Sequence, residues 1–236
     1  MWALIVLLGS CKQESAPVLS DAEILHRNQD ALTEVIIYDV FSPPVASRIY
    51  AYASLAQYEA VRFEQQGSPS MAAKFNGFGS FPQPEPGKEY HYTLAATKAF
   101  FTVVRKVVFS VDSLKAYEDR VYGQFRKSLA KETFDRSVQF GEAVGKVVLA
   151  RAAEDNYAQG RAKVKFVGAQ KPGQWRPTAP DYLDGVEWCW GTMKPFILDP
   201  SDLTENLPVP PAYSLEDGSE YHKELKNFYE VTNNLT

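Results

Sequence analysis

Three histidines are the first residues to test for catalytic or metal chemistry, because imidazole titrates near neutral pH and ligates metals. His26, His91 and His222 lie far apart along the chain. None has a second histidine four residues away or a cysteine partner, which is the spacing of a helical zinc site. Nucleophile elbows and phosphate-binding glycine loops do not occur in the sequence either. We therefore expect surface or helix-capping roles for the three histidines and predict no metal ligands.

Two carboxylates could form an acid/base pair. Asp39 and Glu59 belong to neighbouring predicted helices, so their side chains could converge. Glu59 lies among small residues and is expected to be partly buried, with Arg48 or Arg62 as its partner. A buried glutamate beside an arginine is more often structural than catalytic, and the sequence favours that alternative.

A basic stretch precedes a tryptophan-rich segment of the chain. It contains Lys163, Lys165, Lys171 and Arg176. Arginine is well suited to bind phosphate-like anions through its planar guanidinium. The alternative is a solvated loop whose charges lie in water, and the sequence favours this second interpretation.

Composition and periodicity decide the fold class. Of the 236 residues, 45% are hydrophobic and 13% aromatic, which is typical of a folded chain with a bulky interior. The net charge of −4, without any Lys/Arg block, argues against a nucleic-acid partner. Apolar residues recur at helical spacing, so we predict an all-α bundle of about six helices in one domain, residues 20–236. The expected helices span about 20–41, 42–64, 91–107 and 133–156. A further helix is expected to start at Asp112, with apolar residues up to Phe125, and a last helix to begin near Ser214 or Ser219.

Small residues predict where these helices approach closely. The expected helix 42–64 carries an alanine at five positions, and this density places it at the centre of the bundle. Gly141 and Gly145 lie one turn apart in the expected helix 133–156 and should thin one of its faces.

A long irregular loop is expected at about 160–213. Proline and glycine dominate it, yet it contains Trp175, Trp188 and Trp190. A loop of this length inside a compact domain usually covers something or serves a site. We expect the three tryptophans to pack against the bundle and Cys189 to behave as a small buried hydrophobe.

The first nineteen residues resemble a bacterial lipoprotein signal and linker. An apolar run ends in "LGSC", after which Cys11 would become the lipidated N-terminus. A chance apolar segment before an ordinary cysteine is the alternative. The signal lacks its usual positive residues, and the final "NNLT" is typical of a turn that leads into another helix. These features predict a segment of a longer protein, anchored by lipid at the bacterial cell envelope, in the periplasm or on the outer membrane.

Three stretches together resemble the N-terminal half of bacterial vanadium-dependent haloperoxidase-related proteins, within the type 2 phosphatidic acid phosphatase (PAP2) superfamily. In chain order they are "FSPPVASRIYAYASLAQYEAV" (41–61), "WRPTAPDYLDGVEWCWGTMKPFIL" (175–198) and "PVPPAYSLEDGSEYHKELKNFYEVTNNLT" (208–236). The resemblance implies an all-α enzyme that binds vanadate or phosphate. Its oxyanion site uses a Lys and Arg-Pro motif, Ser-Gly-His, and an arginine followed by a distal histidine, which together stabilise the equatorial oxygens.

None of these site residues can be assigned in this sequence. Ser-Gly-His does not occur, and Lys171 and Arg176 are separated by four residues where the family has six. The resemblance places the catalytic motifs beyond Thr236. We therefore expect no catalytic or cofactor-binding residue in this chain, vanadate only in a full-length homologue, and the missing C-terminal half as a partner. The alternative is a self-sufficient helical envelope lipoprotein that binds a ligand or partner through its Trp-rich loop.

Overall fold

The computed structural model describes residues 18–169, 171–199, 201–202 and 207–235, all of them in helices, turns or irregular segments. The all-α prediction is confirmed for these residues. Cys11 and most of the expected signal segment 1–19 lie outside them. The α-helices are α1 (Asp21–Tyr38), α2 (Pro43–Val61), α3 (Tyr92–Val107), α4 (Asp112–Ser128), α5 (Lys131–Ala153), α6 (Tyr157–Arg161) and α8 (Glu220–Asn233); the 3-10 turns are η1 (Arg62–Glu64), η2 (Ala72–Lys74) and η3 (Trp190–Thr192).

The helix boundaries follow local signals. Ser20 caps α1 by accepting from the Glu23 amide, and the Glu23 carboxylate accepts in return from the Ser20 amide at 2.9 Å. Helix α1 ends before Val40, whose positive φ of 54° leaves the helical region. Pro43 then opens α2 in the first turn, where no amide donor is needed. The capping box and the role of Pro43 were predicted from the sequence, whereas α1 ends earlier than the expected position near Phe41 and the one-turn helix α6 was not predicted.

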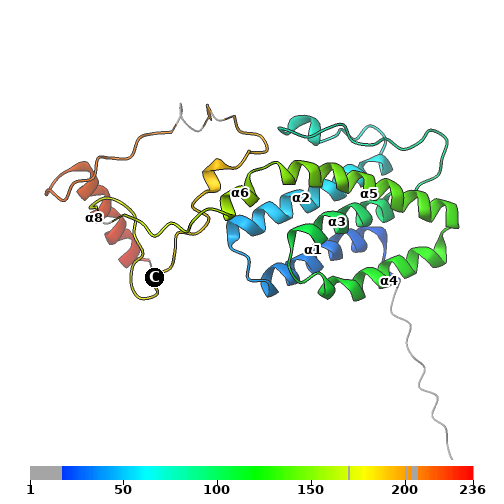
Figure 1. Cartoon of the computed structure of the whole chain (residues 1–236), viewed down its shortest axis with the longest axis horizontal. Helices are drawn as coiled ribbons and strands as arrows, with labels where there is room; N and C mark the ends of the chain where they lie inside the picture. The colour runs from blue at the N-terminus through cyan, green and yellow to red at the C-terminus, as the bar shows by residue number, and fades with distance from the viewer. Residues whose placement is uncertain (1–17, 170, 200, 203–206, 236) are drawn as a thin grey trace, which may run out of the picture.

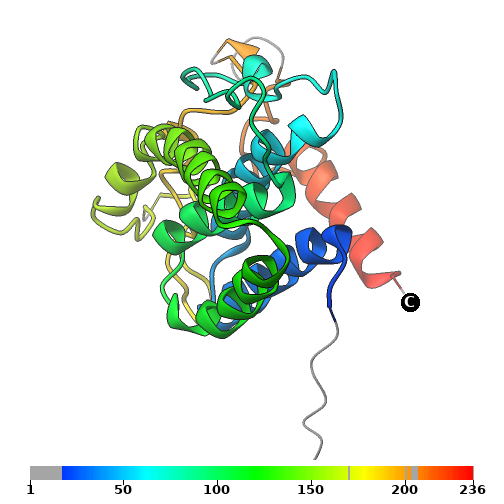
Figure 2. The ribbon, with the colours of Figure 1, turned by 90° about the vertical axis from the view of Figure 1, so that its right-hand side faces the viewer.

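Helices α1 to α5 form the bundle (Figure 1). Figure 2 looks along the bundle and shows these helices running side by side. Helix α3 packs against α1, α2 and α5, and most of its residues are buried. Helix α2 was predicted to lie at the centre of the bundle, and in the structure α2 and α3 occupy the centre together. Phe100 and Phe101 of α3 are almost completely buried, which stabilises the fold by about 1.5–3 kcal/mol for each side chain.

Two glycines set the distance between α3 and α5. A Cβ on Gly141 would lie 2.1 Å from the Ala95 carbonyl oxygen, and one on Gly145 would lie 2.7 Å from the Thr102 Cβ. Both distances are too short for any side chain. The prediction that these glycines thin one face of the helix is confirmed, and that face lies against α3.

Beyond α6 the chain leaves the bundle and returns to it only in part (Figure 1). Helix α8 lies at the far end of this extension and has no buried residue. Its exposed apolar side chains include Leu225, Phe228 and Tyr229. Because α8 buries none of its residues, the extension is held to the bundle by a few specific contacts.

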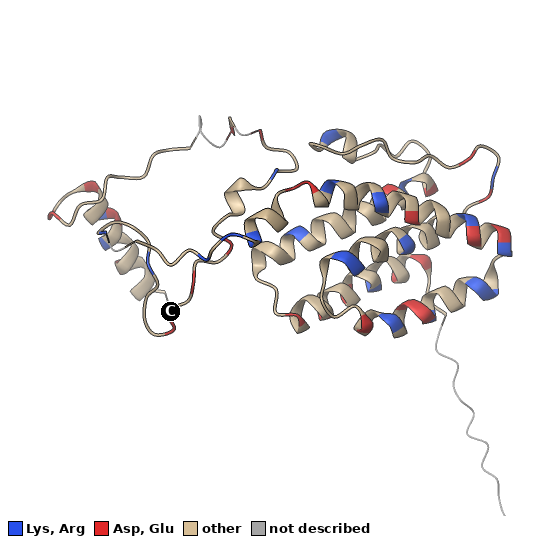
Figure 3. Ribbon diagram, viewed as in Figure 1, with Lys and Arg blue, Asp and Glu red and all other residues tan. Residues whose placement is uncertain are grey.

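Positive and negative residues are interspersed over the bundle, as Figure 3 shows.

The predicted packing of the three tryptophans is correct for Trp190 only. Trp190 packs against the core cluster of α1, α2 and α3, with its ring 6.4 Å from that of Tyr157. For Trp175 and Trp188 the prediction is wrong, because 49% and 47% of their surfaces are exposed. Both pack on Phe166, at ring distances of 5.6 and 5.8 Å, and so form a separate aromatic cluster within the extension.

Candidate functional site

The densest buried polar cluster joins α2 to the end of α5. Arg48 Nε donates to Asp155 Oδ2 at 2.7 Å, and Arg48 Nη2 donates to the Ala152 carbonyl at 3.0 Å. Tyr52 donates its hydroxyl proton to the same carboxylate at 2.9 Å. The other oxygen, Oδ1, accepts from the Tyr157 amide at the start of α6. Both oxygens of the Asp155 carboxylate therefore accept hydrogen bonds.

A second arginine extends this cluster into two loops. Arg151 Nε donates to the Asn76 carbonyl at 2.8 Å, and Nη2 donates to the carbonyls of Lys194 and Pro195 at 2.9 and 3.2 Å. Arg151 Nη1 lies 3.3 Å from the Tyr52 hydroxyl, which links the two arginines. Arg151 is 98% buried, since only 2% of its surface is exposed.

Aromatic rings complete this arrangement. Phe196 packs on Tyr52 with a centroid distance of 4.9 Å, and the Arg151 guanidinium lies 5.8 Å from the Phe196 ring. The Asn76 amide donates to the Phe196 carbonyl at 2.7 Å, so the loop near residue 76 and the segment 194–198 are joined directly. Burial, together with the negative charge of Asp155, raises the pKa of Tyr52. Tyr52 therefore remains a hydrogen-bond donor at any physiological pH.

The chemistry of this cluster is structural. The N–H groups of two buried arginines donate to one carboxylate and to several backbone carbonyls. These hydrogen bonds engage all three nitrogens of the Arg151 guanidinium and the Nε and Nη2 atoms of Arg48. The cluster attaches the segment 194–198 and the loop near Asn76 to the end of the bundle.

Asp39 and Glu59 do not converge into an acid/base pair, as the favoured structural alternative predicted. The Asp39 carboxylate accepts from the Phe109 and Ser110 amides at 2.8 and 3.1 Å, and so caps the turn between α3 and α4. Glu59 is fully buried and accepts from Arg62 Nε at 3.0 Å and from Ser70 Oγ at 2.9 Å. The structural alternative for Glu59 is therefore confirmed, with Arg62 as its partner.

The histidines take the expected minor roles. His91 is the N-cap of α3 and packs edge-on against Phe125 at 4.8 Å. His222 lies 3.2 Å from the Asp217 carboxylate, and His26 is exposed. No group of three potential metal ligands occurs among the described residues. Within the same part of the chain, no helix combines the length and apolarity that a bilayer span requires.

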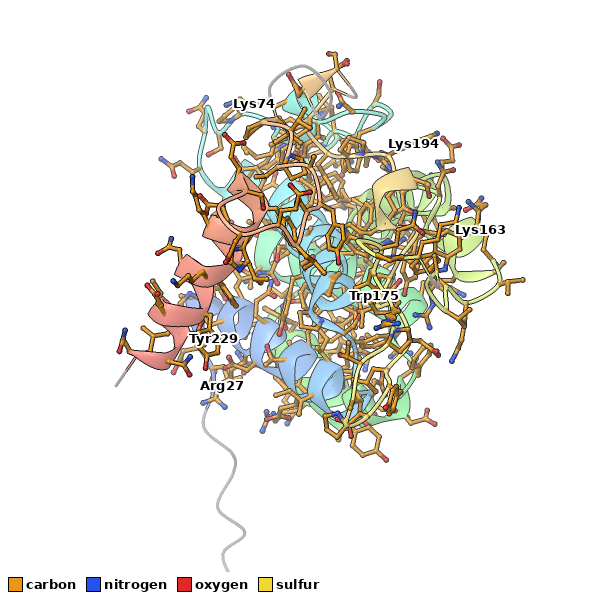
Figure 4. All side chains as sticks on the ribbon, turned by 90° about the vertical axis from the view of Figure 1, so that its left-hand side faces the viewer. Arg27, Lys74, Lys163, Trp175, Lys194 and Tyr229 are labelled. Atoms are coloured by element: carbon orange, nitrogen blue, oxygen red, sulfur yellow. The ribbon has the colours of Figure 1, made fainter. Side chains whose placement is uncertain are left out.

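The basic stretch is spread out along the extension. Lys165 pairs with Asp184 at 2.6 Å, and Lys163 lies 5.8 Å from the centroid of the Trp188 ring. Lys171 and Arg176 are exposed, and Figure 4 shows Lys163 and Trp175 at separate places on this end of the molecule. The solvated-loop interpretation holds for Lys171 and Arg176.

Arg151 and Asp155 are the site residues that the sequence did not predict. Arg151 lies in the last turn of α5 and Asp155 lies two residues beyond the end of that helix, where helical periodicity gives them no special role. A weak signal was present, since an aspartate that precedes a helix can accept from its first amides, as Asp155 does from the Tyr157 amide. Their partners are distant in sequence, since Arg48 and Asp155 are 107 positions apart.

The arginines and histidines described above can be compared with what a vanadate site requires. Such an oxyanion needs several unpaired cationic donors and a histidine that converge on one point. Here Arg48 pairs with Asp155 and Arg151 donates to backbone carbonyls, whereas His26, His91 and His222 lie on α1, at the start of α3 and on α8. Within the described residues, these arginines and histidines do not converge on one point.

One solved structure gives a close comparison. The crystal structure of a protein described as the first bacterial vanadium-dependent iodoperoxidase matches with a TM-score of 0.80 and 38% sequence identity, over 94% of this chain and 53% of that chain. No protein-family model and no curated protein matches the sequence. The resemblance read from the three sequence stretches is thus confirmed. The chain has the all-helical fold of vanadium haloperoxidase/PAP2-related proteins and spans about half the length of the relative that it matches.

Proposed function

We propose that this chain is the helical scaffold region of a vanadium haloperoxidase-like or PAP2-type lipoprotein, and that it is inactive by itself. The observation that supports this most strongly is the 38% identity to the iodoperoxidase over 94% of the chain. The buried cluster supports the inactivity of the chain, because Asp155 and backbone carbonyls already accept hydrogen bonds from Arg48 and Arg151. The oxyanion-site motifs would come from the C-terminal half of the parent protein.

Vanadate titration tests the inactivity. Adding orthovanadate to the 236-residue chain, followed by vanadium-51 NMR and calorimetry, should give no stoichiometric binding, and iodide oxidation with hydrogen peroxide should stay at the uncatalysed rate. Tight one-to-one binding of vanadate would sink this part of the proposal. The reading frame downstream of codon 236 gives a second test, because it should encode Ser-Gly-His and an Arg…His pair.

The partner in this proposal is the C-terminal half of the parent protein. Helix α8 has no buried residue and exposes Leu225, Phe228, Tyr229 and Val231. An apolar face of this kind on a soluble chain usually marks an interaction surface. The isolated chain should therefore bind a hydrophobic dye, and it should lose that binding when the C-terminal half is co-expressed. A monodisperse chain without dye binding would favour the self-sufficient envelope lipoprotein instead.

The membrane association in this proposal is a lipid on Cys11. Feeding cells an alkyne-tagged fatty acid should label the protein, and Cys11→Ser should abolish the label and release the protein from the membrane fraction. Labelling that persists in the variant would exclude Cys11 as the lipid site.

A further inference from the structure

A pocket that the scaffold role does not use lies where the extension leaves the bundle. It has a volume of about 460 Å³, within the range of roughly 300–1,000 Å³ that is usual for small-molecule sites. Helix α6 forms one wall, and the segments near Lys163, Val186 and Trp190 form the others. Figure 4 labels Lys163 at this side of the molecule, away from Tyr229 of α8.

Aromatic and apolar side chains make up most of its lining. Trp188, Trp190 and Tyr157 contribute rings, and Met193 and the buried Cys189 contribute sulfur atoms. Trp and Tyr rings offer large flat surfaces that bind planar ligands with little loss of side-chain freedom. The pocket is therefore suited to a small planar molecule.

The charges in the pocket favour an anion. Its cations are Arg161, Lys163 and Lys165, and its carboxylates are Asp184 and Glu187. Two ion pairs use both carboxylates, Arg161 with Glu187 and Lys165 with Asp184, each at 2.6 Å. Among the described residues, no carboxylate lies within ion-pair distance of Lys163, whose Nζ lies 5.8 Å from the centroid of the Trp188 ring. One positive charge beside an aromatic surface thus remains for a ligand.

The backbone of this pocket is held in an unusual conformation. Glu187 has a positive φ of 46°, which residues other than glycine rarely adopt. Its carbonyl accepts from the Trp190 amide at 2.7 Å, and its side chain is fixed by Arg161. Strained positions of this kind concentrate at binding sites, because the surrounding contacts must maintain them.

We propose that this pocket binds a small aryl carboxylate, with the aromatic ring against the tryptophans and the carboxylate at Lys163. The aromatic surface selects a planar ring, and the unpaired ammonium selects a negative charge over a neutral or positive one. Ligand binding at this pocket does not depend on vanadate.

Titration of the 236-residue chain with benzoate tests the proposal. Calorimetry should show saturable binding, whereas neutral benzamide should bind more weakly and benzylammonium should not bind measurably. Lys163→Gln should weaken benzoate binding by about three- to fivefold, as expected for one half-exposed charge pair, and should remove the preference over benzamide. Lys171→Gln, from the same basic stretch but outside the pocket, is the matched control and should leave the affinity unchanged.

A second readout uses the unmodified pocket. In a Cys11→Ser background, Cys189 is the remaining thiol of the chain, and benzoate should slow its alkylation by a maleimide. Equal protection by benzamide, tighter binding of benzylammonium, or a Lys163→Gln variant with unchanged benzoate affinity would each overturn the proposal. Absence of saturable benzoate binding to the unmodified chain would do so as well.

Discussion

Replacing Gly141 with alanine tests whether α3 and α5 lie as close together as the structure shows. The new Cβ would lie 2.1 Å from the Ala95 carbonyl oxygen and 2.9 Å from the Lys98 Cβ. The first of these atoms belongs to the backbone, so no change of rotamer relieves the clash and the helices must separate. Overpacking costs about 1–3 kcal/mol and sometimes more, which places this backbone clash near the upper end of that range.

The same change also has a favourable component. Alanine is better than glycine inside a helix by about 1 kcal/mol. The net loss in the free energy of unfolding should therefore be about 2 kcal/mol or more, since the clash exceeds the gain. Urea unfolding followed by circular dichroism measures this loss as a lower midpoint.

Gly123→Ala is the matched control. Gly123 lies within α4, and nothing lies within 4 Å of a Cβ at that position. This variant should be more stable than the parent by up to about 1 kcal/mol, because only the helix-propensity gain operates. If Gly141→Ala were stabilised to the same extent, the close approach of α3 and α5 would be refuted.

Two further predictions concern buried and capping carboxylates. Asp155→Asn leaves Arg48 buried without its counter-charge and should destabilise the fold by about 3 kcal/mol, whereas Lys115→Gln, which breaks the exposed pair with Asp119, should cost less than about 1 kcal/mol in the same unfolding assay. Equal losses would contradict the structure. Partial burial raises the pKa of Asp39, but hydrogen bonds from Ser110 and the Phe109 amide outweigh it and lower that pKa below its ordinary value. The stabilisation from Asp39 is therefore present above the unfolded pKa of about 3.9 and lost as the pH falls through the lower native pKa. Asp39→Asn should flatten the decline in stability below about pH 4, and an unchanged acid profile would argue against this capping role.

Local sequence signals determined the helices of this protein. The Ser20–Glu23 capping box begins α1, Pro43 opens α2, and Gly141 and Gly145 mark the face of α5 that touches α3. Each of these features acts within one or two helical turns, through hydrogen bonds or steric demand that neighbouring residues supply. The fold class and the resemblance to haloperoxidase-related proteins could therefore be predicted from the sequence.

Only the tertiary structure decided which polar groups meet. Asp39 caps a turn 70 positions away at Phe109, and Arg48 pairs with Asp155, which lies 107 positions along the chain. No periodicity specifies such pairs, because they depend on how the loops return to the bundle. For the same reason, the packing of the extension could not be predicted from the sequence. Composition indicated that its aromatic residues would pack, yet the loop path places Phe196 on the bundle and leaves Trp188 beside the pocket, half exposed.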